Sequence, residues 1–240
     1  MVGAAASAQE STPMTVEAND LLEWNQNEGT YTAIGNAVAT QGAAEIKANK
    51  LVASYDPASA SRRIGTLVAT GNVTYKNETA TATGDRLVYN VDAETYLVEG
   101  NNAKVTGTNG TMTATKDIRY DAANPEAQMI TANGAAVYVD AEGRSVAGEK
   151  IVALLGVDGA LQTLDADTNV KVISINGQIA TGDAVAYNYT TSKALLTGNV
   201  EIIDGPSIMR GDRAEVDFDS GISRILSDGS GKRVSGVLNP

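Results

Sequence analysis

A short element that returns seven times along the chain is the feature that most restricts its fold. Each copy begins with a small or polar pair, often Gly-Asp, and continues with alternating apolar positions that end in an aromatic or another apolar residue. The copies lie at 19–24, 49–55, 84–89, 116–120, 148–153, 182–187 and 211–216. A spacing of roughly thirty residues is typical of repeat proteins, in which each unit buries its apolar face against its neighbours.

A second element lies between these copies. An apolar residue precedes a Gly-Asn-like turn by two positions, and an apolar-x-apolar strand follows the turn. The clearest examples are 69–75 and 196–202; 98–105 fits, and Leu164 with Val170 and Val172 fits more loosely. Each repeat is therefore predicted to hold two or three short strands.

Alternation within the strands predicts which side chains share a face, because successive residues point to opposite sides. Leu87 and Tyr89 fall on one face and Arg86 on the other. Stacked repeats then give a continuous apolar strip on the inner side. The residues expected to line it are Leu22, Trp24, Val73, Tyr75, Leu87, Tyr89, Val98, Val105, Ile118, Tyr120, Ile130, Val137, Ile151, Leu164, Val170, Val172, Val185, Tyr187, Leu196, Val200, Ile202, Val216 and Phe218.

The apolar residues favour an all-β protein with a thin interior. Hydrophobic residues make up 42% of the chain, but only one Phe and one Trp are present, and small and β-branched residues supply most of the rest. Such residues suit strands, and 24 Gly add closely spaced turn signals. Because large aromatics fill closed cores efficiently, an interior built from Val, Leu and Ala is expected to leave room for a guest.

The chain lacks both Cys and His, which removes most catalytic chemistries. Ser-His-Asp triads, Cys nucleophiles and zinc, copper or haem sites with His or Cys ligands need these residues. Acidic residues such as Asp183, Asp212, Asp217 and Asp219 remain, but none has an apolar context that would raise its pKa. Calcium-binding β-rolls repeat every nine residues, so turn chemistry explains the Gly-Asp pairs better. We expect no enzymatic activity, no metal and no cofactor.

Charge and the terminal segments suggest where the chain works. The formal net charge of −11 is spread along the sequence, so nucleic acid is not an expected partner. Ala6-Ser7-Ala8 before Gln9 is typical of the cleavage site that ends a secretory signal, which predicts export to a periplasm. We therefore expect a signal-peptide remnant or disordered segment at 1–14, one β domain at 15–230 and a flexible tail at 231–240.

The paired elements also match a known family. Gly84 to Tyr89 with Gly71-Asn72-Val73, and Gly182 to Asn188 with Leu196 to Val200, resemble the OstA-like lipopolysaccharide-transport family, in particular its periplasmic bridge proteins of the LptA type. The resemblance extends from about Val16 to about Gly231. It implies an open, twisted β-jellyroll (β-taco) of roughly 14–17 mostly antiparallel strands built from about seven repeats.

The same resemblance implies a function and partners. The apolar strip would be a lipid groove that shields the acyl chains of lipopolysaccharide (lipid A) between the inner and outer membranes. Moving ten methylenes of an acyl chain out of water is favourable by about 8 kcal/mol. Acyl chains therefore need such a shield to cross an aqueous gap. The expected partners are the homologous jellyroll domains of the inner-membrane and outer-membrane transport components.

Unpaired strands at both ends also predict head-to-tail self-association, through Val16 to Trp24 at one end and Ala214 to Leu226 at the other. Two alternatives stay open at this stage. One is a β-solenoid scaffold or adhesin with a closed core and no lipid ligand. The other is a different jellyroll component of the same transport system.

Overall fold

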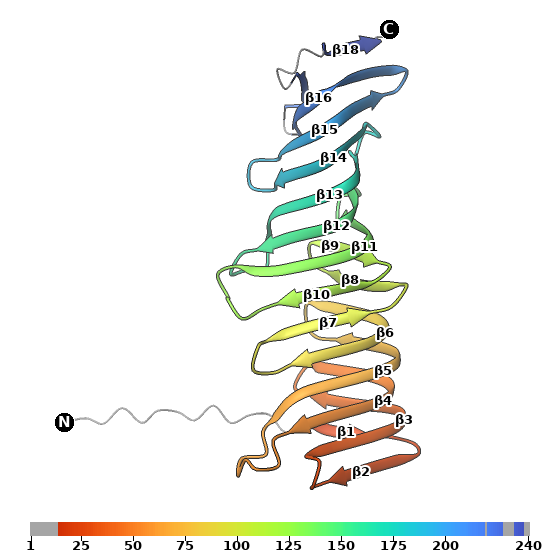
Figure 1. Cartoon of the computed structure of the whole chain (residues 1–240), viewed down its shortest axis with the longest axis vertical. Helices are drawn as coiled ribbons and strands as arrows, with labels where there is room; N and C mark the ends of the chain where they lie inside the picture. The colour runs from red at the N-terminus through yellow and green to blue at the C-terminus, as the bar shows by residue number, and fades with distance from the viewer. Residues whose placement is uncertain (1–13, 219, 228–232, 238–240) are drawn as a thin grey trace, which may run out of the picture.

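The structure, a computed structural model, describes residues 14–218, 220–227 and 233–237. These residues form eighteen strands in one continuous antiparallel sheet, stacked along the long axis of the molecule from β2 at one end to β18 at the other (Figure 1). Ten strands are long: β3 (Thr30–Gln41), β4 (Ala44–Tyr55), β5 (Ile64–Lys76), β6 (Ala80–Asn90), β11 (Gln128–Asp140), β12 (Ser145–Leu155), β13 (Leu161–Ile173), β14 (Ile179–Asn188), β15 (Lys193–Asp204) and β16 (Ser207–Asp217).

The short strands come in pairs, each of which takes the place of one long strand. The pairs are β1 (Thr15–Glu17) with β2 (Leu21–Asn25), β7 (Thr95–Glu99) with β8 (Ala103–Gly107), β9 (Gly110–Ala114) with β10 (Asp117–Asp121), and β17 (Ile222–Leu226) with β18 (Ser235–Val237). Within each pair, the two strands hydrogen-bond to different halves of the same long neighbour, as β17 and β18 do with β16.

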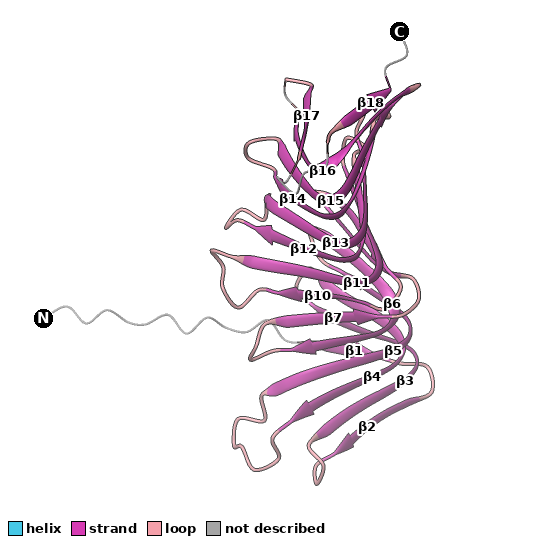
Figure 2. Ribbon diagram, turned by 45° about the horizontal axis from the view of Figure 1, so that its top comes forward, coloured by secondary structure: helices cyan, strands magenta, loops and turns pink. Residues whose placement is uncertain are grey.

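Every long strand bends near its middle, so the sheet folds into two facing walls. Wall 1 holds β2, β7, β10, β17 and the adjoining halves of the long strands, whereas wall 2 holds β1, β8, β9, β18 and the other halves. At one end of the molecule β17 and β18 diverge onto the separate walls (Figure 2). The walls are continuous along the bend, and the turns at their far edges form two rims.

Odd-numbered long strands turn the corner with two residues in the left-handed region. In β15 these are Gly198, with φ of +77°, and Asn199, with φ of +49°. A Cβ atom on Gly198 would lie 2.2 Å from a carboxylate oxygen of Asp183 on β14, so this position has no room for a side chain. The Asn199 amide donates a hydrogen bond of 3.1 Å to the same carboxylate. The acidic residue of the Gly-Asp motif thus packs on the corner of the neighbouring strand.

Even-numbered strands turn the corner differently. In β6, Gly84 lies on the inner side, Asp85 and Arg86 follow, and the next inner residue is the buried Leu87. A Cβ atom on Gly84 would approach Val98 to 2.6 Å and the Glu99 carbonyl oxygen to 2.8 Å. Glycine is required here because the inside of the bend is too crowded for any side chain.

The all-β jellyroll class is confirmed, and three details differ from the sequence-based expectations. Gly71-Asn72 and Gly198-Asn199 are not hairpin turns but β-bulges within β5 and β15, because two residues face one on the neighbouring strand, whereas Gly100-Asn101 connects β7 to β8. The described residues form eighteen strands, above the expected 14–17, because four crossings are split into short pairs. The expected flexible tail at 231–240 contains β18, which pairs with β16. The predicted signal remnant lies, apart from Met14, outside the described residues.

Candidate functional site

The candidate site is the interior between the two walls. Nearest the bend, one row of side chains crosses wall 1 from end to end, and cross-strand partners link each member to the next. Large and small residues alternate along most of the row. Its members are Leu22, Ala33, Leu51, Ala69, Leu87, Val98, Ile118, Ala132, Ile151, Ala166, Val185, Leu196, Ala214 and Ile225.

Closer to the rims, each wall carries one further row that faces the interior. On wall 1 this row runs through Trp24, Tyr31, Ala53, Leu67, Tyr89, Tyr96, Tyr120, Ile130, Ala153, Leu164, Tyr187, Ala194 and Val216. On wall 2 it runs through Val16, Ala39, Ile46, Tyr75, Ala82, Val105, Met112, Tyr138, Val146, Val172, Ala180, Ile202 and Met209. Both inner faces are therefore apolar over the length of the molecule.

Most residues chosen from the sequence as interior lining fall on these inner faces. The first two rows hold fourteen of them, the wall 2 row holds Tyr75, Val105, Val172 and Ile202, and Val73, Val170 and Val200 lie just past the corner on wall 2. Phe218 follows β16 and packs edge-on against the Tyr187 ring, with centroids 5.5 Å apart. Leu22 and Trp24 belong to the inner rows but are 59% and 45% exposed, because β2 is an end strand.

The position of Val137 differs from the sequence-based prediction. It lies on the outer side of β11, opposite Thr113 and Ala147, while its neighbours Ala136 and Tyr138 point inward and are buried. The sequence analysis had placed Val137 among the residues expected to line the interior. Spacing decides the question, because the two-residue bulge at Gly134-Ala135 keeps the inner residues of β11 at even-numbered positions.

Several interior residues were missed from the sequence. They include the alanines of the inner rows and the larger Ile46, Leu51, Tyr96, Met112 and Val146. Counting by two along each strand from an accepted inner residue would have found most of them. At the even-strand corners the inner residues change between even and odd positions, as in the step from Gly84 to Leu87. This change could not be located without knowing where the strand bends.

The interior is filled in this conformation, contrary to the expectation of room for a guest. Residues of the row at the bend, such as Leu87, Ile151 and Leu196, are fully buried. One cavity of about 20 Å³ lies between the walls in the C-terminal half, enough for about one water molecule. An acyl chain needs many times that volume, so it can enter this cavity only if the walls separate.

Aromatic side chains take part in the contact between the walls. The Tyr75 ring of wall 2 lies 5.6 Å from the Tyr96 ring of wall 1, and Tyr96 stacks on Tyr89 at 4.2 Å. Burial, the hydrogen bond with Tyr89 and the nearby Tyr75 raise the pKa of Tyr96 well above its usual range. In the C-terminal half, burial together with the neighbouring Tyr189 and Asp140 raises the pKa of Tyr138.

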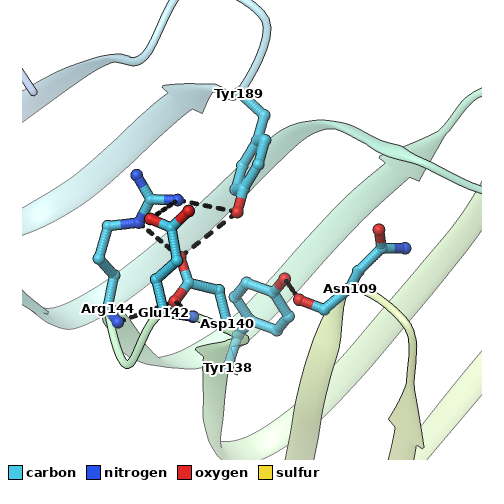
Figure 3. A network of polar contacts seen from close by, with 6 residues as sticks. All are labelled: Asn109, Tyr138, Asp140, Glu142, Arg144 and Tyr189. Carbon is cyan, nitrogen blue, oxygen red and sulfur yellow. Dashed lines mark hydrogen bonds and ion pairs between the residues drawn. The ribbon is translucent and has the colours of Figure 1, made fainter. Parts of the chain in front are cut away.

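A polar network spans the rims above the small cavity (Figure 3). Arg144 in the turn between β11 and β12, on wall 2, reaches Tyr189, which follows β14 on wall 1. Its guanidinium donates hydrogen bonds to Asp140 at 2.5 Å and to the Tyr189 hydroxyl at 2.9 Å. Burial alone would lower the pKa of Arg144. The hydrogen bond and the charge of Asp140, together with the nearby Tyr187 and Tyr189, raise this pKa by more than burial lowers it, so the side chain stays cationic.

The acidic residues considered for catalysis have structural contacts. Asp183 packs on the corner of β15, and Asp217 accepts a hydrogen bond from the backbone N–H of Ser220, which lowers the pKa of Asp217. Asp219 lies outside the described residues. Among the described residues, no group of three or more Asp or Glu side chains is arranged to hold a metal ion. That part of the chain also contains no helix that is long and apolar enough to cross a membrane.

The N-terminal half of this two-walled sheet matches a known protein family. Residues 15–127 match the family described as LptA/(LptD N-terminal domain) LPS transport protein. Residues 15–127 thus have the sequence pattern of this Lpt family. The resemblance inferred from the repeat is thereby confirmed, and the family match covers the strands from β1 to β10 and the whole turn after β10.

Other comparisons add less. Among solved structures, the chain is similar to the crystal structure of LptH, the LptA homologous periplasmic component of the conserved lipopolysaccharide transport device from Pseudomonas aeruginosa. The two are 14% identical, the alignment covers 95% of this chain and 96% of that chain, and the TM-score is 0.26. No curated protein sequence matches the chain.

Proposed function

We propose that this Lpt-family protein binds the acyl chains of lipopolysaccharide between its two walls and carries them across the periplasm without catalysing a reaction. The observation that supports this most directly is the continuity of the inner rows. The row nearest the bend runs from Leu22 to Ile225, and the two rim-side rows run from Trp24 to Val216 and from Val16 to Met209. An apolar path of this kind suits a long apolar cargo better than a compact ligand.

Separation of the walls costs little in hydrophobic free energy if an acyl chain takes the place of the opposite wall. The side chains of the two rim-side rows then stay covered, and the acyl chain itself leaves water at about 0.8 kcal/mol for each buried methylene. The bend can act as the hinge, because the backbone ladder runs through it and the row beside it is already fully packed.

Head-to-tail assembly is part of the proposal. On its outer side, β2 has an unpaired edge within the described residues, and apolar side chains at this end are exposed: Val16, Leu21, Leu22 and Trp24. At the opposite end β17 and β18 also have free outer edges, with Ile222, Val234 and Val237 exposed. Pairing one end with the other would join the inner rows of two copies, or of one copy and a related domain of another transport component.

Photocrosslinking tests the groove. A photoreactive residue at Ile130 or Val105, which are inner positions near the rims and only partly buried, is expected to form adducts with purified lipopolysaccharide. Val137 is a matched control, because it lies on the same strand as Ile130 but on the outer face. Adducts at Val137 alone, or at no position of the folded protein, would contradict the carrier function.

The filled interior also favours a second candidate, a β-scaffold that has a permanently closed core. That candidate predicts no adducts at Ile130 or Val105 while the protein stays folded and assembles through its ends. The same experiment therefore separates the two functions.

A further inference from the structure

The rims are bridged in the C-terminal half by a cluster of four residues, Asp140, Glu142, Arg144 and Tyr189 (Figure 3). Asp140 ends β11, Glu142 and Arg144 lie in the following turn on wall 2, and only Tyr189 belongs to wall 1. The Tyr189 hydroxyl accepts a hydrogen bond from Arg144 at 2.9 Å and lies 3.4 Å from the Asp140 carboxylate, to which it can donate. The guanidinium carbon also lies 5.3 Å from the centre of the Tyr189 ring.

The wall 2 side of this cluster is rigid. The Asp140 carboxylate accepts hydrogen bonds from the backbone N–H groups of Glu142 and Arg144, at 2.9 and 2.8 Å, as well as from the Arg144 side chain. Only 3% of the Asp140 side chain is exposed, and Arg144 is 19% exposed. Because the turn is held by its own hydrogen bonds, the contacts with Tyr189 can break without unfolding it.

A second bond between the rims lies close by. The Asn109 side chain, in the β8–β9 turn on wall 2, donates a hydrogen bond of 2.6 Å to the carbonyl oxygen of Gly159 on wall 1. The Asn109 carbonyl oxygen in turn accepts a hydrogen bond of 2.6 Å from the inward-pointing Tyr138 (Figure 3). Both bridges lie next to the small cavity between the walls, which Tyr138, Asp140, Arg144 and Tyr189 help to line.

We propose that Asp140, Arg144 and Tyr189 form a latch that holds the two rims together in the lipid-free protein and opens when an acyl chain enters. This inference rests on the proposed function and adds to it a control on entry. The apolar contacts between the walls can be exchanged for acyl contacts, but the directed bonds to Tyr189 cannot. The free energy of lipid binding must therefore exceed the free energy of these bonds before the rims can separate.

A buried arginine could also recognise a lipid phosphate, but the charge of the cluster around Arg144 argues against that role. Arg144 already faces two carboxylates, from Asp140 at 2.5 Å and Glu142 at 3.1 Å, so the cluster carries a net charge of −1. An incoming phosphate would meet that negative charge. The two roles predict opposite effects of removing Arg144 on the affinity for lipopolysaccharide.

The first experiment measures the separation of the rims without any lipid. The chain has no Cys, so spin labels can be attached cleanly at Ala141→Cys and Thr191→Cys, which are exposed turn positions on opposite rims. Pulsed electron paramagnetic resonance should give one short distance for the parent. In a Tyr189→Phe variant the distribution should become longer and broader. An unchanged distribution in this variant would overturn the latch, whatever the protein binds.

The second experiment measures affinity for purified lipopolysaccharide. Tyr189→Phe and Arg144→Gln should bind about three- to tenfold more tightly, the range expected from the loss of one or two partly buried hydrogen bonds. Arg63→Gln is the matched control and should leave the affinity unchanged, because Arg63 lies in an exposed turn of the wall 1 rim and its ion pair is with Asp92 on the same rim.

The outcomes separate the latch from the proposed function. Weaker binding by Arg144→Gln, in a variant shown to be folded by circular dichroism, would overturn the latch and favour phosphate recognition. Equal affinity in all variants would overturn the latch and leave the groove intact. No binding by the parent would refute the proposed function, and a latch for lipid entry would be refuted with it, even if the rims separate in Tyr189→Phe.

Discussion

Gly84 gives the sharpest test of how the sheet turns its corner. The glycine starts the motif copy in β6 and lies inside the bend, where a Cβ atom would be 2.6 Å from a methyl carbon of Val98 and 2.8 Å from the backbone oxygen of Glu99. Contacts this short are not found in real structures, and the second involves backbone that cannot rotate away. We expect Gly84→Ala to lower the free energy of unfolding by about 2–3 kcal/mol, the usual range for overpacking a dense site.

Gly65 provides the matched control. It lies in the adjacent strand β5, and the nearest atom to its added Cβ would be 3.9 Å away, at the Asp92 carboxylate. Alanine should fit this position and restrict the unfolded chain, so Gly65→Ala is expected to raise the free energy of unfolding by about 0.5 kcal/mol.

Urea denaturation followed by circular dichroism measures both changes. The two variants make the same chemical change in neighbouring strands, so the difference in sign isolates the crowding inside the bend. A Gly84→Ala protein as stable as the parent, or a loss of equal size in both variants, would refute our account of the corner. Val98→Ala in the Gly84→Ala background should restore only part of the loss, because the contact with the Glu99 oxygen remains.

Two further predictions concern assembly and pH. Leu22→Asp places a charge among the exposed apolar side chains of the β2 end, so it should lower the increase of mass with protein concentration that light scattering measures. Val157→Asp, in an exposed rim loop, is the control and should leave this increase unchanged. Equal assembly by both variants would count against head-to-tail contacts. The pKa values of Tyr96 and Tyr138 are raised above their unfolded value of 10.0, so their contribution to stability is complete below about pH 10 and is lost as the pH rises further, when the unfolded chain ionises first. The urea midpoint should therefore be lower at about pH 11 than at about pH 9, values on either side of the ordinary tyrosine pKa. Tyr96 and Tyr138 should ionise only as the protein unfolds, and ionisation of these two residues near about pH 10 in the folded protein would contradict this.

Alternation within single strands was the part of the fold that could be predicted from sequence. Leu87 and Tyr89 share the inner face of β6, and Val185 and Tyr187 share that of β14, as the period of two requires. The prediction was wrong at Val137, which lies on the outer face of β11. It also failed at the corners, since a Gly-Asn pair is a strong turn signal and only the partner strands show that the strand continues past it.

The contacts between the walls could not be predicted from sequence. Arg144 and Tyr189 are 45 positions apart, and Tyr75 and Tyr96 meet only because the bend brings different strands face to face. Nor does a composition poor in Phe and Trp leave the interior empty. The walls simply approach until Ala, Val, Leu and the tyrosines fill the space between them.

The two kinds of corner limit where the chain can change its length. In β6 the inner positions step from Gly84 to Leu87, and in β15 the left-handed pair at Gly198 keeps the spacing even. Loss or gain of one residue at either corner would turn the rest of that strand inside out, so that charged side chains would face the interior. The rim turns have no such restriction, and they already range from two residues after β15 to eight after β4. New recognition loops can therefore be added at the rims, and the protein can be lengthened by whole repeats, without any change in the cross-section of its interior.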